Sequence, residues 1–267
     1  MDYRGQNALI TGAPSGIGAA FAAALAARGA SLMLSARREA RLHDLAARLS
    51  AAHGVRAEVA VADLAVEGAG RALAEETRRR LGSVDVLISN AGFGTFGPFH
   101  GTDRGRIHAQ VMLNAVAVAD LAHAVLPGMV ERGGGVVVNV ASTAAFQPVA
   151  YMATYGATKA FVLSLTEALW AEYRRHGVRV LALCPGPTDT EFFDVVGTNA
   201  FAVGKLEPPE LVVERALAAV DRGKGTLVSG LVNLLLSECA RFTPRAVVSS
   251  MSEKVMRAKV PGAAARP

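Results

Sequence analysis

The chain has 267 residues, a length that suits one large α/β domain or two small ones. Its formal net charge is +5 and its basic residues are scattered, which argues against a nucleic-acid-binding surface. The two cysteines, Cys184 and Cys239, have no metal-ligand spacing and are too few for a disulfide framework. No signal peptide is visible, and no apolar run approaches the roughly 18 residues of a membrane span. We therefore expect a cytoplasmic protein without metal, nucleic-acid partner or membrane span.

Short apolar runs alternate with longer segments of helical periodicity along most of the chain. Strands are expected at 8–11, 31–36, 56–61, 84–89, 135–140, 178–184 and 226–229. Helices are expected at 16–28, 39–52, 103–132 and 154–175, and another helix between the third and fourth strands ends near Leu81. This alternation is typical of a doubly wound, parallel α/β sheet, and no linker or repeat interrupts it. The sequence thus predicts a single domain over residues 1–260 and a flexible tail over 261–267.

Two segments depart from the alternation. Residues 185–209 have little regular structure and are rich in Thr, Gly and Phe, and so long a loop is usually functional. We interpret about 187–210 as a substrate lid. The segment 231–267 has a weak helical pattern, and its role cannot be predicted from the sequence.

A glycine-rich turn follows the first strand, with the sequence Thr11-Gly12-Ala13-Pro14-Ser15-Gly16-Ile17-Gly18. A strand, a glycine turn and a helix N-terminus make a pyrophosphate site, because free N–H groups and the positive helix end face the ligand. The spacing is not the commoner G-x-G-x-x-G, and alone it could be a plain tight turn. In a Rossmann-type sheet, the candidate cofactor contacts here are Gly12, Ser15, Gly16, Ile17 and Gly18.

The end of the second strand indicates which dinucleotide is bound. NAD sites of this type usually place an acidic residue there, for the ribose 2′-OH. Here the strand ends in Ala36-Arg37-Arg38. A guanidinium can bind a 2′-phosphate by paired, charge-assisted hydrogen bonds, although both arginines could simply be solvated. We favour NADP(H), with Arg37 as first choice and Arg38 as second.

Residues after the third and fourth strands complete the expected cofactor site. Asp63, next to Leu64, could accept a hydrogen bond from the adenine amino group or could cap a helix. Asn90-Ala91-Gly92 ends the fourth strand, where ligands bind in open α/β sheets, although the same residues also make ordinary turns.

A candidate proton donor lies near the start of the helix at 154–175. Tyr155 and Lys159 are four residues apart and therefore share a helix face. An ammonium beside a phenol favours the phenolate, so we expect the tyrosine pKa to fall below its usual value of about 10. Such a phenol could protonate a carbonyl oxygen. Ser142 could hydrogen-bond the same oxygen, although the spacing does not distinguish it from Thr143.

Together these motifs resemble the short-chain dehydrogenase/reductase family over roughly residues 7–190. The resemblance rests on the glycine turn, Asn90-Ala91-Gly92, Asn114, Ser142, Tyr155, Lys159 and Pro185-Gly186. It departs at Ser89, where many members carry Asn.

The resemblance implies a role for each matching residue. Tyr155 exchanges the proton with the substrate, Lys159 holds the nicotinamide ribose and tunes Tyr155, and Ser142 rather than Thr143 orients the carbonyl. Asn114 holds a water in a proton relay through Lys159. Bordering the nicotinamide are Pro185, Gly186 and Thr188. Family habit further implies a homodimer or homotetramer formed by helices that look apolar on several sides, although such helices could also be buried inside the monomer.

Seven of the ten phenylalanines fall after strands whose carboxyl ends should carry the substrate. They are Phe93, Phe96, Phe99, Phe146, Phe192, Phe193 and Phe201. We expect a bulky, largely apolar small-molecule carbonyl or alcohol as substrate, although these rings could pack under their own loops. The candidate contacts are Ser142, Phe93, Phe146, Tyr151, Phe192 and Phe193.

Three functions remain to be weighed. The first is an NADP(H)-dependent oxidoreductase. The second is a catalytically silent NADP(H)-binding sensor, which would have no need of Ser142, Tyr155 and Lys159. The third is an epimerase or dehydratase, for whose larger substrate domain the C-terminal part leaves little room. The sequence indicates neither the substrate nor the reaction direction.

Overall fold

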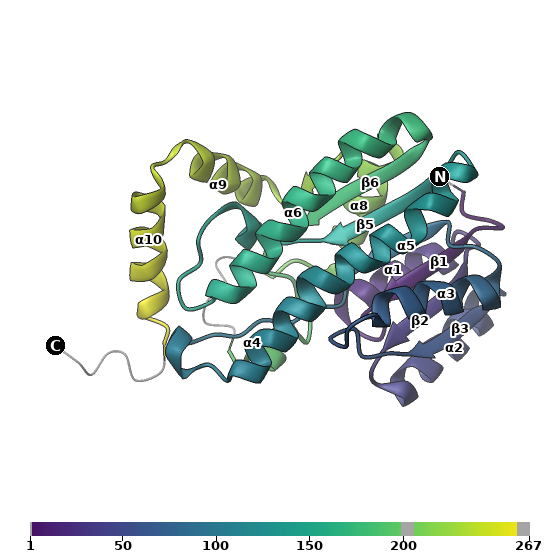
Figure 1. Cartoon of the computed structure of the whole chain (residues 1–267), viewed down its shortest axis with the longest axis horizontal. Helices are drawn as coiled ribbons and strands as arrows, with labels where there is room; N and C mark the ends of the chain where they lie inside the picture. Colours follow the sequence, from purple (N-terminus) through teal and green to yellow (C-terminus); the bar gives the residue numbers. More distant parts are fainter. Residues whose placement is uncertain (1, 199–205, 261–267) are drawn as a thin grey trace.

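The computed structural model describes residues 2–198 and 206–260, and in them seven parallel strands form one sheet (Figure 1). The strand order is β3-β2-β1-β4-β5-β6-β7. The strands are β1 (Asn7–Thr11), β2 (Ser31–Ala36), β3 (Ala57–Val61), β4 (Val86–Ser89), β5 (Gly135–Val140), β6 (Val178–Cys184) and β7 (Thr226–Val228). Each strand lies within two residues of its expected bounds, and the doubly wound Rossmann-type fold is confirmed.

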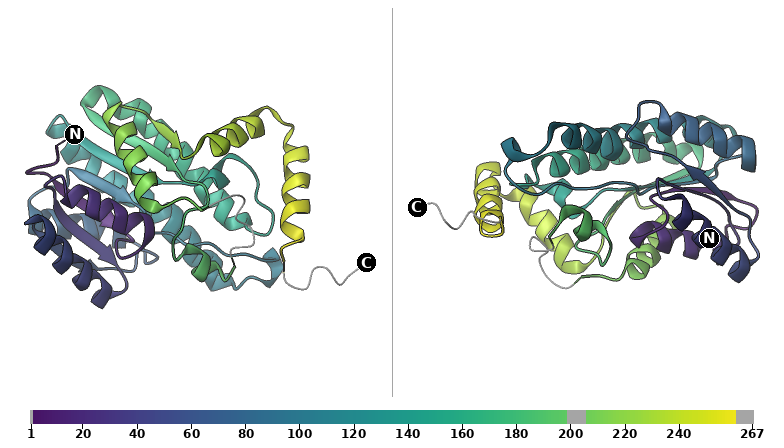
Figure 2. Two further views of the ribbon diagram at one scale, coloured as in Figure 1. Left: turned by 180° about the vertical axis from the view of Figure 1, so that it is seen from behind. Right: turned by 90° about the horizontal axis from the view of Figure 1, so that it is seen from below.

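Helices cover both faces of the sheet (Figure 2). One layer contains α1 (Gly16–Ala26), α2 (Glu39–His53) and α8 (Pro209–Asp221). The other contains α3 (Ala69–Leu81), α5 (Ala117–Glu131) and α6 (Ala153–Tyr173). Because side chains alternate along a strand, Ile10 packs into the first core and Leu9 into the second. This burial on both faces explains why the strands read as continuous apolar runs.

The helix expected at 103–132 spans Arg104–Glu131, but it is not uniform. It consists of α4 (Arg104–Val111), a π-helical segment (Met112–Val116) and α5. Asp103 starts it by accepting a hydrogen bond from the Arg106 N–H at 2.7 Å. By length and composition alone this helix could cross a membrane, but half of its apolar window is buried, and it packs on α3 and the sheet. It therefore packs as a core helix of the domain. The cytoplasmic location of the protein stays a prediction.

The C-terminal segment forms two helices, which the weak pattern in the sequence did not delimit. They are α9 (Leu231–Phe242) and α10 (Arg245–Arg257), separated by an extended Thr243 and by Pro244. Proline favours extended backbone in the residue before it, so it separates the two helices. Figure 1 shows both helices, in yellow, projecting beside the start of α6. The expected tail, 261–267, lies outside the described residues.

Candidate active site

A cavity of about 1100 Å³ opens at the carboxyl edge of the sheet. Chain order reverses there between β1 and β4, which is where open α/β sheets bind ligands. The cavity brings the expected cofactor and substrate residues together. Those that line it are Gly12, Ser15, Gly16, Ile17, Arg37, Arg38, Asp63, Leu64, Asn90, Ala91, Gly92, Phe93, Ser142, Phe146, Tyr155, Lys159, Pro185, Gly186, Thr188, Phe192 and Phe193.

The glycine turn is built so that no side chain could replace its glycines. Gly12 and Gly16 have φ of +65° and +52°, which favours glycine. A Cβ on Gly18 would lie 2.2 Å from the Gly12 carbonyl oxygen. Gly18 is therefore a packing residue of the turn rather than part of the cavity lining. The Asn90 side chain closes the turn by donating to the carbonyls of Thr11 and Gly12 at 3.0 and 3.2 Å.

The turn presents free hydrogen-bond donors to the cavity. Ser15 is the N-cap of α1, but its side chain accepts no capping hydrogen bond, so the first-turn N–H groups of α1 keep no side-chain partner there. Those N–H groups and the helix dipole suit an anion. The arrangement therefore fits a pyrophosphate.

Arg37 and Arg38 are both exposed at the end of β2 and both line the cavity. Arg38 Nη2 donates to Ser15 Oγ at 3.4 Å and pairs with Glu191 Oε2 at 2.7 Å. Arg41, one helical turn later, pairs with the other oxygen of Glu191 at 2.5 Å. Sequence reasoning missed Arg41. The only available signal was its position on the same helix face as Arg38.

Asp63 does not cap a helix, because the next helix, α3, begins at Ala69 with Gly68 as its N-cap. Its Oδ1 accepts a hydrogen bond from the Ala65 N–H at 3.0 Å, which is a local turn. Asp63 and Leu64 also line the cavity next to the end of β2.

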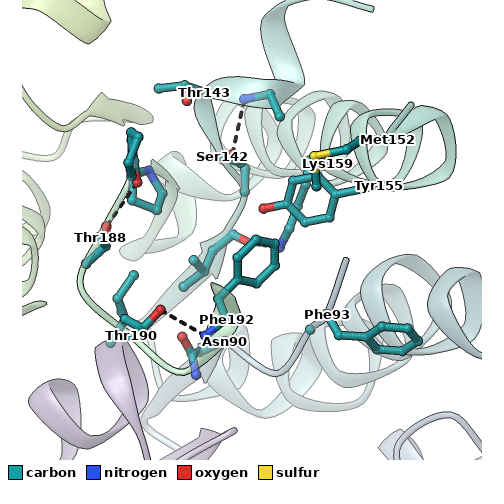
Figure 3. Close-up of a pocket in the computed structure, with 18 of the residues that line it drawn as sticks. Asn90, Phe93, Ser142, Thr143, Met152, Tyr155, Lys159, Thr188, Thr190 and Phe192 are labelled. Atoms are coloured by element: carbon teal, nitrogen blue, oxygen red, sulfur yellow. Dashed lines mark hydrogen bonds between the residues drawn. The ribbon is translucent and has the colours of Figure 1, made fainter. Parts of the chain in front are cut away.

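Tyr155 and Lys159 face the cavity from α6, and Figure 3 shows them side by side. Their side chains are nearly buried, with exposed fractions of 9% and 5%. Lys159 Nζ donates to the Val140 carbonyl at 2.7 Å and lies 5.8 Å from the centroid of the Tyr155 ring. The lysine is thus fixed between the tyrosine and the end of β5.

The expected lowering of the tyrosine pKa is wrong for this structure. Burial raises the pKa of Tyr155 to about 12, although a hydrogen bond with Ser142 partly opposes this. Burial also lowers the pKa of Lys159 to about 8, with Cys184 opposing. Loss of solvent outweighs these opposing interactions, because burial penalises the charged form of each group.

Ser142, rather than Thr143, lies next to the tyrosine hydroxyl. Ser142 begins the short 3₁₀ turn (Thr143–Phe146) that follows β5, and its Oγ accepts a hydrogen bond from the Ala144 N–H at 3.1 Å (Figure 3). The hydrogen bond that Ser142 shares with Tyr155 identifies the hydroxyl that faces the phenol. Thr143 also lines the cavity, but its N–H is held by the Pro185 carbonyl at 3.0 Å.

Asn114 is buried in the π-helical segment and does not line the cavity. Its Oδ1 accepts from the Phe93 N–H at 3.1 Å, and its Nδ2 donates to the Phe93 carbonyl at 2.9 Å and to Thr158 Oγ1 at 3.2 Å. It therefore ties the long helix to α6 and to the loop after β4. A Cβ on Gly92 would lie 3.1 Å from Asn114 Oδ1 and 3.6 Å from Lys159 Nζ, so Gly92 keeps these groups close.

The expected lid is anchored at its base. Within the described part of 187–210, Thr188 and Glu207 form a parallel bridge, and Thr188 Oγ1 donates to the Gly186 carbonyl at 3.0 Å. Glu207 is held in turn by Arg215 of α8 and by Ser229. The residues between, 199–205, which include Phe201, lie outside the described residues.

A short helix, α7 (Phe192–Val196), carries two aromatic rings toward the tyrosine. The centroid of the Phe192 ring lies 5.3 Å from that of Tyr155, and Phe193 packs edge-on against Phe192 at 5.9 Å. Figure 3 shows Phe192 beside Tyr155 and Lys159, whereas the Phe93 ring points away from them.

Two expectations about the substrate wall need correction. Tyr151 does not line the cavity, because its hydroxyl donates to Glu253 of α10 at 3.4 Å, so the ring faces that helix. Phe99 is 62% exposed. Instead, the far wall comes from helices that no sequence rule placed there. Its apolar residues are Val232, Leu236, Val248, Met251, Val255 and Met256.

A family model described as short chain dehydrogenase matches residues 6–200, most of the chain. The chain belongs to the short-chain dehydrogenase/reductase family. It is thus an oxidoreductase. This short-chain dehydrogenase/reductase is 31% identical over 222 residues to an uncharacterized oxidoreductase of Staphylococcus saprophyticus, a match covering 83% of this chain and 94% of the relative.

Solved structures give the same assignment. A short-chain dehydrogenase from Sphingobium yanoikuyae in complex with NADPH has a TM-score of 0.79 and 34% identity, covering 90% of this chain and 97% of that one. A bulky-bulky ketone specific alcohol dehydrogenase from Comamonas testosteroni has a TM-score of 0.75 and 33% identity, covering 90% and 96%.

Proposed function

We propose that this short-chain dehydrogenase/reductase uses NADP(H) to interconvert a largely apolar ketone or aldehyde and the corresponding alcohol. The observation that carries the proposal is a single cavity. Ser142, Tyr155 and Lys159 face the same space as the glycine turn and Arg38. A proton donor, a carbonyl-orienting hydroxyl and a dinucleotide cradle are what this reaction needs in one place.

The residues present fit NADP(H). The glycine turn would hold the pyrophosphate, and the guanidinium groups of Arg37 and Arg38, with Ser15, would hold the 2′-phosphate. Asp63 and Leu64 would border the adenine. The residues that would border the nicotinamide and its ribose are Asn90, Ala91, Gly92, Tyr155, Lys159, Pro185, Gly186 and Thr188. When bound, the cofactor supplies or accepts the hydride at the substrate carbon.

The protein's own contribution is to move a proton and to orient the carbonyl. Because burial raises the pKa of Tyr155 to about 12, the phenol is protonated at neutral pH and can donate to the substrate oxygen. The Ser142 hydroxyl hydrogen-bonds the same oxygen as charge develops on it. The Lys159 ammonium, held by the Val140 carbonyl, stabilises the phenolate that forms. Asn114 positions the helix that carries Lys159 by its hydrogen bond to Thr158. In this proposal it also holds a water of a proton relay that runs through Lys159.

An apolar substrate is supported by the cavity wall. Phe192 of α7 contacts the Tyr155 ring, and aliphatic side chains from α9 and α10 line the same cavity. Pockets of this kind bind a ligand mainly by burying its apolar surface. A silent sensor gains no support, because such a protein needs no buried tyrosine–lysine pair facing a substrate-sized space.

We also propose that the chain forms a homodimer or homotetramer through α6. Phe161 is 44% exposed on this helix. It lies among small exposed residues, which are Ala153, Ala157, Ala160, Ser164 and Ala168. A face of small residues lets a second copy approach closely about a two-fold axis. Light scattering of the eluted protein would measure the assembly, and Phe161→Glu should reduce its mass.

A substrate panel tests the reaction class. Apolar ketones of increasing size, sugar-like carbonyl compounds and charged aldehydes would be offered with NADPH or NADH, and the loss of reduced-cofactor absorbance would be followed. We expect turnover of bulky apolar ketones with NADPH. Turnover confined to sugar-like or charged compounds would contradict the apolar-substrate proposal.

A further inference from the structure

Glu191 lies on the lid, directly before α7, yet its carboxylate reaches the end of β2. Its Oε2 is 2.7 Å from Arg38 Nη2, and its Oε1 is 2.5 Å from Arg41 Nη1. One carboxylate therefore bridges two arginines that come from a different part of the chain. All three side chains are partly exposed, with exposed fractions of 38%, 46% and 54% for Glu191, Arg38 and Arg41.

The carboxylate is ionised at neutral pH. Partial burial raises the pKa of Glu191, but the hydrogen bonds from Arg38 and Arg41 outweigh burial, and the net pKa lies below the usual value. Glu191 thus places a full negative charge against the guanidinium groups beside the glycine turn.

The donor that Glu191 occupies is one that a 2′-phosphate needs. Arg38 Nη2 serves both Glu191 and Ser15, and Ser15 belongs to the glycine turn. A guanidinium binds one anion at a time along each donor edge, and two anions on the same edge repel one another. A phosphate that binds on the Nη2 edge of Arg38, next to Ser15, must therefore displace the carboxylate.

We propose that Glu191 is an internal competitor of the cofactor's 2′-phosphate for Arg38 and Arg41, and so sets the affinity for NADP(H). This inference rests on the proposed cofactor. It adds a specificity-determining residue outside the glycine turn and outside the end of β2. Glu191 weakens binding of the 2′-phosphate, and Arg41 becomes available to the phosphate only when Glu191 leaves.

The exchange also acts on the catalytic end of the site. Next to Glu191, Thr190 packs on the glycine turn, where a Cβ on Gly16 would come within 2.5 Å of Thr190 Cγ2. On its other side, Phe192 contacts Tyr155. Binding of a phosphate at Arg38 therefore releases one of the contacts that hold this segment over the tyrosine.

The binding test uses Glu191→Gln and two ligands that lack the nicotinamide. Adenosine 2′,5′-bisphosphate carries the 2′-phosphate, and 5′-AMP does not. Titration calorimetry should show that Glu191→Gln binds the bisphosphate about two- to tenfold more tightly than wild type, the range expected from exposed ion pairs. Its affinity for 5′-AMP should stay unchanged.

A matched control separates competition from a general change of charge. Glu39 is an exposed carboxylate next to Arg38 in sequence, and its ion pair is a distant one with His43 at 3.7 Å. Glu39→Gln removes the same charge without freeing Arg38, so it should not tighten bisphosphate binding. Equal tightening in both variants would overturn the proposal in favour of a long-range field effect.

Hydrogen exchange supplies a second readout. Adding the bisphosphate to wild type should speed amide exchange in residues 188–198, whereas Glu191→Gln should exchange fast already. Unchanged exchange in wild type would overturn the coupling to the lid. If wild type binds the bisphosphate no better than 5′-AMP, the proposed cofactor itself fails. A wild-type preference that Glu191→Gln leaves unaltered contradicts only the competition.

Discussion

The choice between NADPH and NADH should depend more on Arg38 than on Arg37. Both arginines line the cavity, but Arg38 also reaches Ser15 of the glycine turn, at 3.4 Å from its Oγ. A phosphate held by Arg38 would therefore also lie within reach of the turn. From the sequence alone, Arg37 was the first choice and Arg38 the second.

The magnitude follows from the exposure of the pair. A hydrogen bond to a charged group contributes roughly 1.5–3 kcal/mol, a factor of about ten to a hundred in affinity. The Arg38 side chain is 46% exposed, so solvent screening favours the lower end of that range. We expect Arg38→Ala to lower kcat/KM for NADPH about tenfold and Arg37→Ala to lower it less, with little effect of either variant on NADH.

Steady-state kinetics with both cofactors and one ketone would measure these effects, and titration with NADP⁺ and NAD⁺ would separate binding from turnover. Equal losses for NADPH and NADH in Arg38→Ala would refute the reasoning, because the arginine would then be structural. A wild-type preference for NADH would refute the cofactor assignment as a whole.

Three further predictions follow from the site. Because burial lowers the pKa of Lys159 to about 8, its ammonium is lost as the pH rises above that value, and the rate of ketone reduction should decline there. Lys159→Met should be slow at every pH. A wild-type rate that stays constant through this pH range would count against the lysine's role. Gly18→Ala would place a Cβ 2.2 Å from the Gly12 carbonyl oxygen and should reduce NADP⁺ affinity. Gly101→Ala is the control, because its Cβ would meet nothing within 4 Å. Equal NADP⁺ affinities of the two variants, measured by calorimetry, would contradict the packed turn. In a series of ketones of increasing chain length, each buried CH₂ should stabilise the transition state by up to about 0.8 kcal/mol, so kcat/KM should rise with chain length. Met256→Ala in the far wall and Phe193→Ala in the lid should make this rise less steep. No gain with chain length in wild type would exclude an apolar pocket.

The sheet could be predicted because its strands are buried on both faces. Val136, Val137 and Val138 of β5 are nearly inaccessible, and a run of this kind has few alternatives to a central parallel strand. The glycine turn could also be predicted from the sequence, because Gly12 and Gly16 adopt the positive φ that other residues avoid. Strand, turn and helix then placed the cofactor site with no tertiary information.

What the sequence could not give depends on contacts between distant segments. The sequence did not predict the π-helical segment that buries Asn114, because such segments are rare and lie inside otherwise regular helices. The wall formed by Val248 and Met256 required knowing that α10 turns back toward α6. Tyr151 looked like a substrate contact by its position, yet it pairs with Glu253.

The tyrosine pKa shows the same limit. The i, i+4 spacing correctly placed Tyr155 and Lys159 on one helix face, but the direction of the pKa shift depends on burial, which the spacing does not report.

The most direct test of the account is the turnover of Tyr155→Phe, because the proposed reaction needs the phenolic proton and the ring alone cannot supply it. NADPH oxidation with an apolar ketone should fall by about 10²–10⁴-fold in this variant, while NADPH binding, followed by cofactor fluorescence, stays close to that of wild type. Wild-type turnover in Tyr155→Phe would contradict the central claim.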